Sequence, residues 1–318
     1  MAAYAFRRLL WFIPVLWVVA TITFFLMHAV PGGPFTEDKK LPPAVNDALN
    51  RRYHLDQPLY KQYGLYLWDA SHGDLGLSFQ GDKDVSEIIR RTFFVTAQLG
   101  MLGLIVAVVV GMTLGTLSAL NHNGPLDYIG VGFATIGASV PNFIMGAFLA
   151  IIFAINLGWL KLLGWGGPIQ VSDIFDSSVY DWRKVVIPVI AVSALPAAYL
   201  ARVTRASVLE VLNQDYIRTA RAKGLPESRV VMRHTIKNAL IPVLTVMGPI
   251  AANLVTGSFI IETMFSIPGL GRETISAIVR RDYATIMGTT LFFTLIITTA
   301  NLLVDLAYAV VDPRIRYR

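Results

Sequence analysis

The sequence predicts an all-α polytopic membrane protein with six transmembrane helices. Hydrophobic residues make up 54% of the 318 residues and charged residues only 15%, whereas about 25% of an average soluble protein is charged. The charges fall in clumps separated by long uncharged runs. This composition excludes a disordered, collagen-like or coiled-coil chain and argues against a soluble enzyme. The net charge of +6 then reflects where lysine and arginine lie relative to a membrane, and we expect no nucleic-acid partner.

Six runs without Asp, Glu, Lys or Arg are long enough to cross a bilayer, which takes about 20 residues of apolar helix. They cover residues 9–36, 92–126, 128–160, 185–201, 238–261 and 283–304. We therefore expect membrane spans at about 9–30, 96–120, 130–157, 185–204, 238–261 and 285–308.

The first and fourth runs each leave an alternative open. Arg7 and Arg8 precede the first run as in a cleaved signal peptide, but its apolar stretch exceeds the usual length of about 7–15 residues. It ends in Pro-Gly-Gly-Pro at 31–34, a helix stop, so we interpret it as a retained helix. The fourth run is the shortest. Arg202 and Arg205 at its end must either reach the membrane surface or face protein.

The distribution of basic residues predicts that both termini are cytoplasmic. An even number of spans places segments 1–8, 121–127, 202–237 and 312–318 on one side, and 31–91, 158–184 and 262–282 on the other. The first set holds 13 lysines and arginines in 58 residues, and the second holds 14 in 109. Because cytoplasmic loops carry the excess of basic residues, the first set is expected inside.

The extracytoplasmic loop 31–91 is long enough to form short helices. One helical face is shared by Val45, Ala48, Leu49 and Tyr53. Pro58 is placed to begin a second helix, because proline suits the first helical position.

Small residues recur at four-residue spacing in two predicted spans. They are Gly103, Ala107, Gly111, Gly115 and Ala119 in the second, and Ala134, Ala138, Gly146, Ala150, Ala154 and Gly158 in the third. Such stripes let helix backbones approach closely, and we expect packing within one chain rather than a subunit interface.

Asn142 and Asn301 are uncharged polar residues at membrane depth. They either line a solute path or form hydrogen bonds between helices.

Motifs for catalysis and cofactor binding are missing from the sequence. There is no Cys, the five His residues show no metal-ligand spacing, and neither a Walker A nor a Gly-x-Ser-x-Gly motif occurs. Glu262, Asp305 and Arg202 lie near span ends, where helix anchoring is a better explanation than an ion relay. We therefore expect a chain that is not an enzyme and holds no metal or cofactor.

The most informative segment is the inner loop 202–237, which carries eight basic residues. Within it, residues 216–223 are expected to form a short amphipathic helix, because Gly224 is a natural helix terminator and Pro226 follows it closely. Such a helix binds anionic lipid, merely follows the positive-inside rule, or docks into a soluble partner. The residues alone leave these three hypotheses open.

Residues 213–225, Asn-Gln-Asp-Tyr-Ile-Arg-Thr-Ala-Arg-Ala-Lys-Gly-Leu, resemble the cytoplasmic EAA loop of ABC-importer permeases in its dipeptide and oligopeptide form. Further motifs resemble the B-type permease subunit of that family. They lie at 4–10, 31–34, 55–59, 73–78, 139–143, 262–271, 281–283, 301–305 and 312–317. The chain departs from the general pattern at 218–220, where Arg-Thr-Ala replaces Glu-Ala-Ala, a form usual in peptide-type permeases.

The resemblance implies a type I ABC-importer permease architecture in the cytoplasmic membrane of a bacterium or archaeon. This chain would form half of a translocation pore, and a second homologous permease would complete it. Two cytoplasmic ATPase subunits would bind ATP and Mg, and an extracytoplasmic solute-binding protein would deliver the cargo. The expected cargo is a di- or oligopeptide, although the same subfamily includes importers of nickel, glutathione and other small solutes.

The resemblance also implies that the 216–225 segment is a coupling helix seated in a groove of one ATPase. The expected interface comprises Asp215, Tyr216, Arg218, Thr219, Ala220, Arg221, Lys223, Gly224 and Leu225. The three basic residues are expected to make polar contacts there, while Tyr216, Ala220 and Leu225 pack. Closure of the ATPases would then rearrange the spans by alternating access.

A secondary transporter driven by an ion gradient is the alternative from another class. Such a protein needs a paired ionisable site near mid-membrane and internal repeats. Neither is visible, because every uncharged run lacks charge at its centre.

Overall fold

The structure, a computed structural model, describes residues 2–30, 56–79 and 83–311, and within them the regular secondary structure is helical, with no strand. The long apolar helices are α1 (Ala2–Ala29), α4 (Val85–Leu120), α7 (Trp182–Leu212), α10 (Lys237–Val255) and α13 (Tyr283–Val311). The shorter ones are α3 (Leu59–Ser71), α5 (Pro125–Ser139), α6 (Asn142–Leu149), α8 (Asp215–Ala222), α9 (Glu227–Arg229), α11 (Phe259–Met264) and α12 (Leu270–Val279). Two π-helical turns, η1 (Ala150–Asn156) and η4 (Val230–Ile236), and two 3-10 turns, η2 (Val171–Phe175) and η3 (Ser177–Val179), complete the order.

Five helices in the described residues are long and apolar enough to cross a membrane, and the number is six if a bent pair of helices is counted as one span. The predicted all-α polytopic fold is therefore confirmed. The α3 helix begins at Leu59, directly after Pro58, where a second loop helix was predicted. The helix predicted around residues 45–53 lies outside the described residues.

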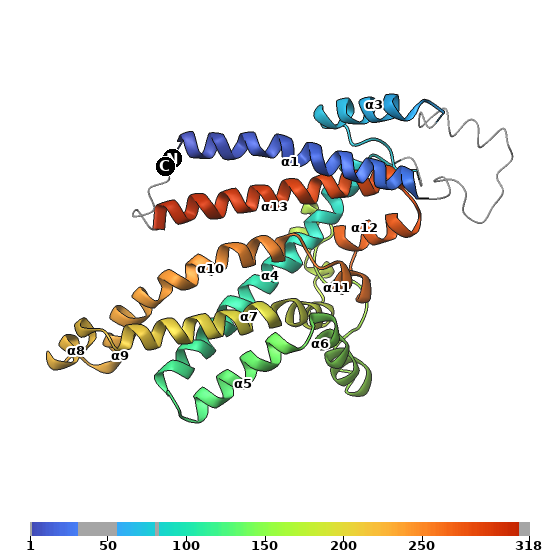
Figure 1. Ribbon diagram of the computed structural model, residues 1–318. Coiled ribbons are helices and arrows are strands. Elements are labelled where there is room, and N and C mark those ends of the chain that lie inside the picture. Colours follow the sequence, from blue (N-terminus) through green and yellow to red (C-terminus); the bar gives the residue numbers. More distant parts are fainter. Residues whose placement is uncertain (1, 31–55, 80–82, 312–318) are drawn as a thin grey trace.

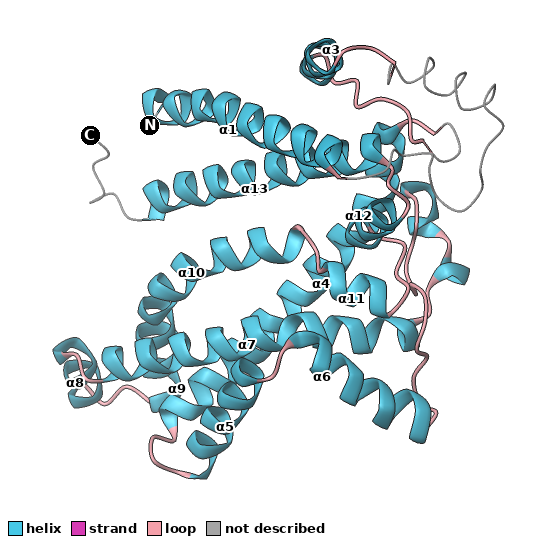
Figure 2. Ribbon diagram, turned by 45° about the vertical axis from the view of Figure 1, so that its right-hand side comes forward, coloured by secondary structure: helices cyan, strands magenta, loops and turns pink. Residues whose placement is uncertain are grey.

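The third predicted span, 130–157, is not a single straight helix. α5 and the combined α6–η1 helix meet at 108°. The cause is local, because Pro141 disfavours a helical conformation in the preceding residue, and Val140 has the extended dihedrals φ −93° and ψ 119°. The bend turns α6 away from α5 and toward the end of the bundle that carries α11 (Figures 1 and 2).

The most extensive helix pair is α4 against α7, and the small residues of α4 explain it. All five members of its predicted stripe are buried. A Cβ atom on Gly111 would lie 2.7 Å from the Ala197 carbonyl oxygen, and one on Gly115 would lie 2.5 Å from that of Ala201. The two backbones therefore touch, which confirms packing within one chain for this stripe.

The α1 and α13 helices run side by side, apart from the α5–α7 side of the bundle (Figure 1). Near their shared end, Arg8 Nη2 lies 2.7 Å from Asp305 Oδ2. Asp305 thus ties two helices together, in agreement with an anchoring role.

The elements also divide between two ends of the molecule. α8, the start of α1 and the end of α13 lie toward one end, whereas α3, α11 and α12 lie toward the other (Figures 1 and 2). We call these the α8 end and the α12 end.

The predicted span 238–261 is interrupted near the α12 end, because α10 ends at Val255 and Gly257 adopts a left-handed φ of +86°.

Candidate functional site

The α8 helix forms where the sequence predicted a short amphipathic helix, and its ends follow from residue type. Asp215 lies in its first turn and Arg221 in its last, so both charges complement the helix dipole. Gly224 has a left-handed φ of +74°, which confirms the expected terminator. Its amide donates to the Arg221 carbonyl at 2.9 Å, and the Leu225 amide donates to that of Ala220 at 3.4 Å.

The apolar face of α8 packs against its own chain. Ile217 and Ala220 are buried against Val230, with Leu225 packed beside them. The Ala220 side chain is thus already covered by its own chain, and the expectation that it packs into a partner groove stays a prediction. A short amphipathic helix can bury its apolar face internally or externally, and periodicity does not distinguish the two.

The opposite face of α8 is exposed and mixed in charge. It presents Asp215, Arg218, Thr219 and Ala222, with Tyr216 and Lys223 exposed at its edge. Their spacing of three and four residues places the first four on one side of the helix. Ala222 was missed by the sequence analysis, although its position seven residues after Asp215 indicates the same face. We call this set the outer face of α8.

Arg221 braces the segment internally. Its Nη2 donates to Glu227 Oε1 at 2.6 Å and its Nε to Glu227 Oε2 at 3.1 Å. These bonds raise the pKa of Arg221 and close the turn between α8 and α9. The Tyr216 hydroxyl accepts a bond from Asn238 Nδ2 at 3.1 Å, so the outward-pointing tyrosine is also held by α10.

A second polar cluster links α4, α5 and α7 near α8. Arg205 donates from Nε to Asp127 Oδ1 at 2.6 Å and from Nη2 to Oδ2 at 2.7 Å. The Ser118 hydroxyl donates to the same carboxylate. Asp127 as a whole is buried, with an exposed fraction of only 3%. Of the two arginines at the end of the fourth run, Arg205 therefore faces protein, while Arg202 is exposed.

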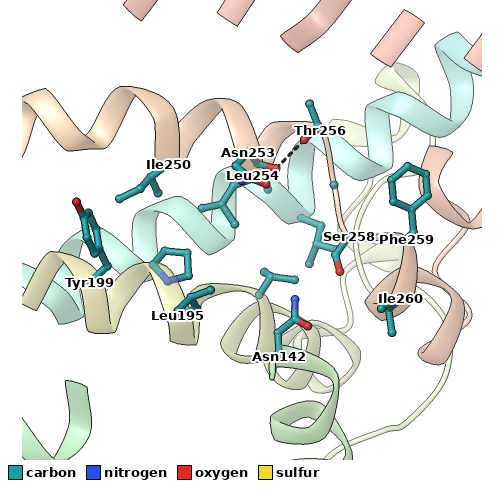
Figure 3. Close-up of a pocket in the computed structure, with 15 residues that line it drawn as sticks. Asn142, Leu195, Tyr199, Ile250, Asn253, Leu254, Thr256, Ser258, Phe259 and Ile260 are labelled. Atoms are coloured by element: carbon teal, nitrogen blue, oxygen red, sulfur yellow. Dashed lines mark hydrogen bonds between the residues drawn. The ribbon is translucent and has the colours of Figure 1, made fainter. Parts of the chain in front are cut away.

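A cavity of about 620 Å³ opens among α4, α6, α7, α10 and α11 (Figure 3). Its lining is Leu99, Gly100, Asn142, Val192, Leu195, Pro196, Tyr199, Ile250, Asn253, Leu254, Thr256, Gly257, Ser258, Phe259 and Ile260. Asn142 points from α6 toward α10 in Figure 3. Asn301 is exposed on α13 and is not among the lining residues, so the structure separates the two asparagines that the sequence grouped together.

A buried carboxylate holds one wall of this cavity in place. Glu262 is fully buried and accepts hydrogen bonds from Thr96 Oγ1 at 3.0 Å and the Arg272 amide at 3.1 Å. Gly257, Gly269 and Gly271 approach the carboxylate so closely that a Cβ on any of them would lie within 3 Å of an oxygen. The 262–271 motif thus anchors α11 and α12 to α4.

Two other motifs meet at the α12 end. Asp282 is fully buried and accepts bonds from Ser78 Oγ at 2.5 Å and from the Phe79 amide at 3.1 Å. Thr285 Oγ1 donates to it as well, at 2.8 Å. Motifs 73–78 and 281–283, some two hundred residues apart, therefore form one hydrogen-bonded unit.

Apolar helices long enough to cross a membrane, with a cavity among them, define a polytopic membrane protein. The chain belongs to the family described as binding-protein-dependent transport system inner membrane component, whose model matches residues 111–317. It is thus a multi-pass permease subunit of the cytoplasmic membrane, and the family implies ATPase and binding-protein partners.

Full-length relatives and solved structures agree with this family. The chain is 41% identical to the oligopeptide transport system permease protein OppB of Haemophilus influenzae over all of both chains. It is 42% identical to the dipeptide transport system permease protein DppB of Bacillus subtilis, over 99% of this chain and 98% of that one. The fold is similar to that of the inward-facing MetNI methionine ABC transporter, with a TM-score of 0.56 and 17% identity over 71% of this chain and 97% of that one. None of these likenesses supports the ion-gradient alternative.

Proposed function

We propose that this chain forms one half of the translocation pore of an ATP-driven importer of di- or oligopeptides. The observation that carries the proposal is its full-length likeness, at 40–42% identity, to permeases named for oligopeptide and for dipeptide transport. A second homologous permease supplies the other half. ATP and Mg are bound by two partner ATPases, and this chain has no catalytic role.

In this proposal the α8 end is cytoplasmic and the outer face of α8 docks into one ATPase. Arg218, Thr219 and Ala222 then contact the ATPase, with Asp215 and Lys223 at the margin. The α12 end faces the solute-binding protein. Supporting this assignment, the outer face is the part of α8 left exposed after its apolar residues pack internally.

The position of α8 between α7 and α10 supports a route by which a movement of the ATPase reaches the cavity. α7 leads directly into α8, and α9 and η4 lead from it into α10. α7 contributes Leu195 and Tyr199 to the cavity wall, and α10 contributes Asn253. A displacement of α8 is therefore transmitted through two helices that border the same cavity. The π-helical turn η4 and the break at Gly257 are the places where α10 can adjust.

Reconstitution tests the proposal directly. The complete assembly, with the second permease, both ATPases and the binding protein, should take up di- or oligopeptides into liposomes in an ATP-dependent manner. The chain alone should neither hydrolyse ATP nor move solute. Peptide uptake by the lone chain under an ion gradient would instead establish a secondary transporter.

A further inference from the structure

Two side-chain amides border the cavity without hydrogen-bond partners. Asn142 begins α6 and Asn253 lies near the end of α10, and both line the cavity (Figure 3). Within the described part of the chain, no hydrogen bond is formed by either side chain. The bond that involves Asn253 uses its backbone carbonyl, which accepts from Thr256 Oγ1 at 2.7 Å. Each carboxamide therefore retains two donors and one acceptor for a ligand.

The other residues that line the cavity limit the kind of ligand group that these amides can bind. Most of it is apolar, and it includes no Asp, Glu, Lys, Arg or His. Of its three hydroxyls, that of Thr256 donates to the Asn253 carbonyl and that of Ser258 accepts from the Ile261 amide. The Tyr199 hydroxyl forms no hydrogen bond within the described residues and is a further neutral polar group in the lining. In apolar surroundings a hydrogen bond is stronger than in water. A neutral group with one donor and one acceptor fits this cavity better than an ion does.

A peptide main chain presents such a group at every residue. We propose that Asn142 and Asn253 are specificity-determining contacts that hydrogen-bond the main-chain amides of a peptide in transit, whatever its side chains. This inference rests on the proposed function and deepens it, because it names the chemical group of the peptide that is recognised in the translocation pathway. The volume of about 620 Å³ lies within the range of known small-molecule sites.

Replacing each asparagine with leucine removes the amide at similar size. Asn142→Leu, Asn253→Leu and the double variant are assembled with the second permease, the ATPases and the binding protein in liposomes. Asn301→Leu is the matched control, since Asn301, like Asn253, is exposed and forms no hydrogen bond within the described residues, but it does not line the cavity. Trialanine is the probe. We expect its uptake to fall roughly three- to tenfold in each single variant, with the control unchanged.

A second readout separates amide recognition from a structural role. Two depsipeptide analogues of trialanine are compared with the parent, each with one amide replaced by an ester. The preference for trialanine over an analogue contains a contribution from the binding protein, which is the same for every variant. If this preference is lower in the asparagine variants than in the wild type, the difference measures the contribution of the pore, without that of the binding protein. We expect such a drop, of roughly three- to tenfold, for at least one analogue.

Each outcome decides the matter. An unchanged preference in both leucine variants overturns the inference while leaving the proposed function intact, provided the wild type imports trialanine. Loss of the second permease from an asparagine variant also overturns it, in favour of a contact between subunits. Failure of the wild-type assembly to import trialanine or any other peptide overturns the proposed function itself. Binding-protein-stimulated ATP hydrolysis should persist in the variants, which shows that coupling is intact.

Discussion

Ala220 and Ala222 lie close together in α8 but face opposite directions. Ala220 is buried beside Ile217 and Val230, whereas Ala222 is exposed on the outer face. This difference makes them a matched pair, because the same substitution at the two positions tests two different interactions.

Ala220→Glu should unfold the α8 segment, since a charge without a partner in that apolar contact costs several kcal/mol. We expect loss of uptake, loss of ATPase co-purification and rapid proteolysis within the 202–237 loop. Ala222→Glu should leave the loop resistant to protease but weaken ATPase binding, because it alters only the outer face. Unimpaired uptake by Ala220→Glu would refute the packing role. If the Ala222→Glu variant binds the ATPase as the wild type does, the outer face of α8 is not part of the ATPase interface.

Gly224 is required by its backbone conformation rather than by crowding. No atom lies within 4 Å of a Cβ built at this position, but its φ is +74°. A β-branched residue is strained there by about 1–3 kcal/mol, so Gly224→Val should reduce both uptake and ATPase co-purification. Gly224→Asn is the control, since asparagine tolerates left-handed dihedrals, and it should retain most of the activity. Equal behaviour of the two variants would show that conformation is not the reason for this glycine.

Glu262→Ala should destabilise the assembled permease. It removes the acceptor of the Arg272 amide and of the Thr96 hydroxyl, and a buried donor left unpaired costs about 1–3 kcal/mol. Glu273→Ala is the control, because Glu273 pairs with Arg280 at a partly exposed site where an ion pair contributes about 0–1 kcal/mol. Thermal unfolding of the detergent-solubilised complex measures both. A lower melting temperature for Glu273→Ala than for Glu262→Ala would contradict this account.

Among the elements, the α4–α7 pair is held by close backbone contacts. A Cβ on Gly115 would lie 2.5 Å from the Ala201 carbonyl oxygen, whereas one on Gly132 of α5 would meet no atom within 4 Å. Gly115→Val should therefore force the helices apart, at a cost of about 1–3 kcal/mol or more, and lower the yield of assembled complex. Gly132→Val should assemble normally. Assembly of Gly115→Val at the wild-type level would show that the pair can separate without penalty.

The elements also show what sequence could predict and what it could not. Hydropathy located the long apolar helices, and the turn chemistry of Gly224 located the end of α8. The bend at Val140 and the break at Gly257 lie within uncharged runs, so charge counting passes over both. The contacts of Glu262 with Thr96 and of Asp282 with Ser78 join residues far apart in sequence. Such pairings depend on how the helices assemble, which local patterns do not encode.

At the scale of the whole molecule, the two ends defined by α8 and α12 predict a topology. The chain has no cysteine, so single introduced cysteines give unambiguous labels. His72→Cys and Ser177→Cys should react with an impermeant maleimide from outside intact cells, and Ser228→Cys only after permeabilisation. All three positions are exposed. Ready labelling of position 228 from outside would reverse the orientation.

The close contact between α4 and α7 has a mechanical consequence. The glycine stripe holds α7 at several points, from Gly103 against Val192 to Gly115 against Ala201. At a rise of about 1.5 Å per residue, these contacts extend over about 14 Å of α7. Held over that length, α7 has no single pivot on α4. A movement imposed at the α8 end therefore carries both helices together, and Val192 on the cavity wall moves with them.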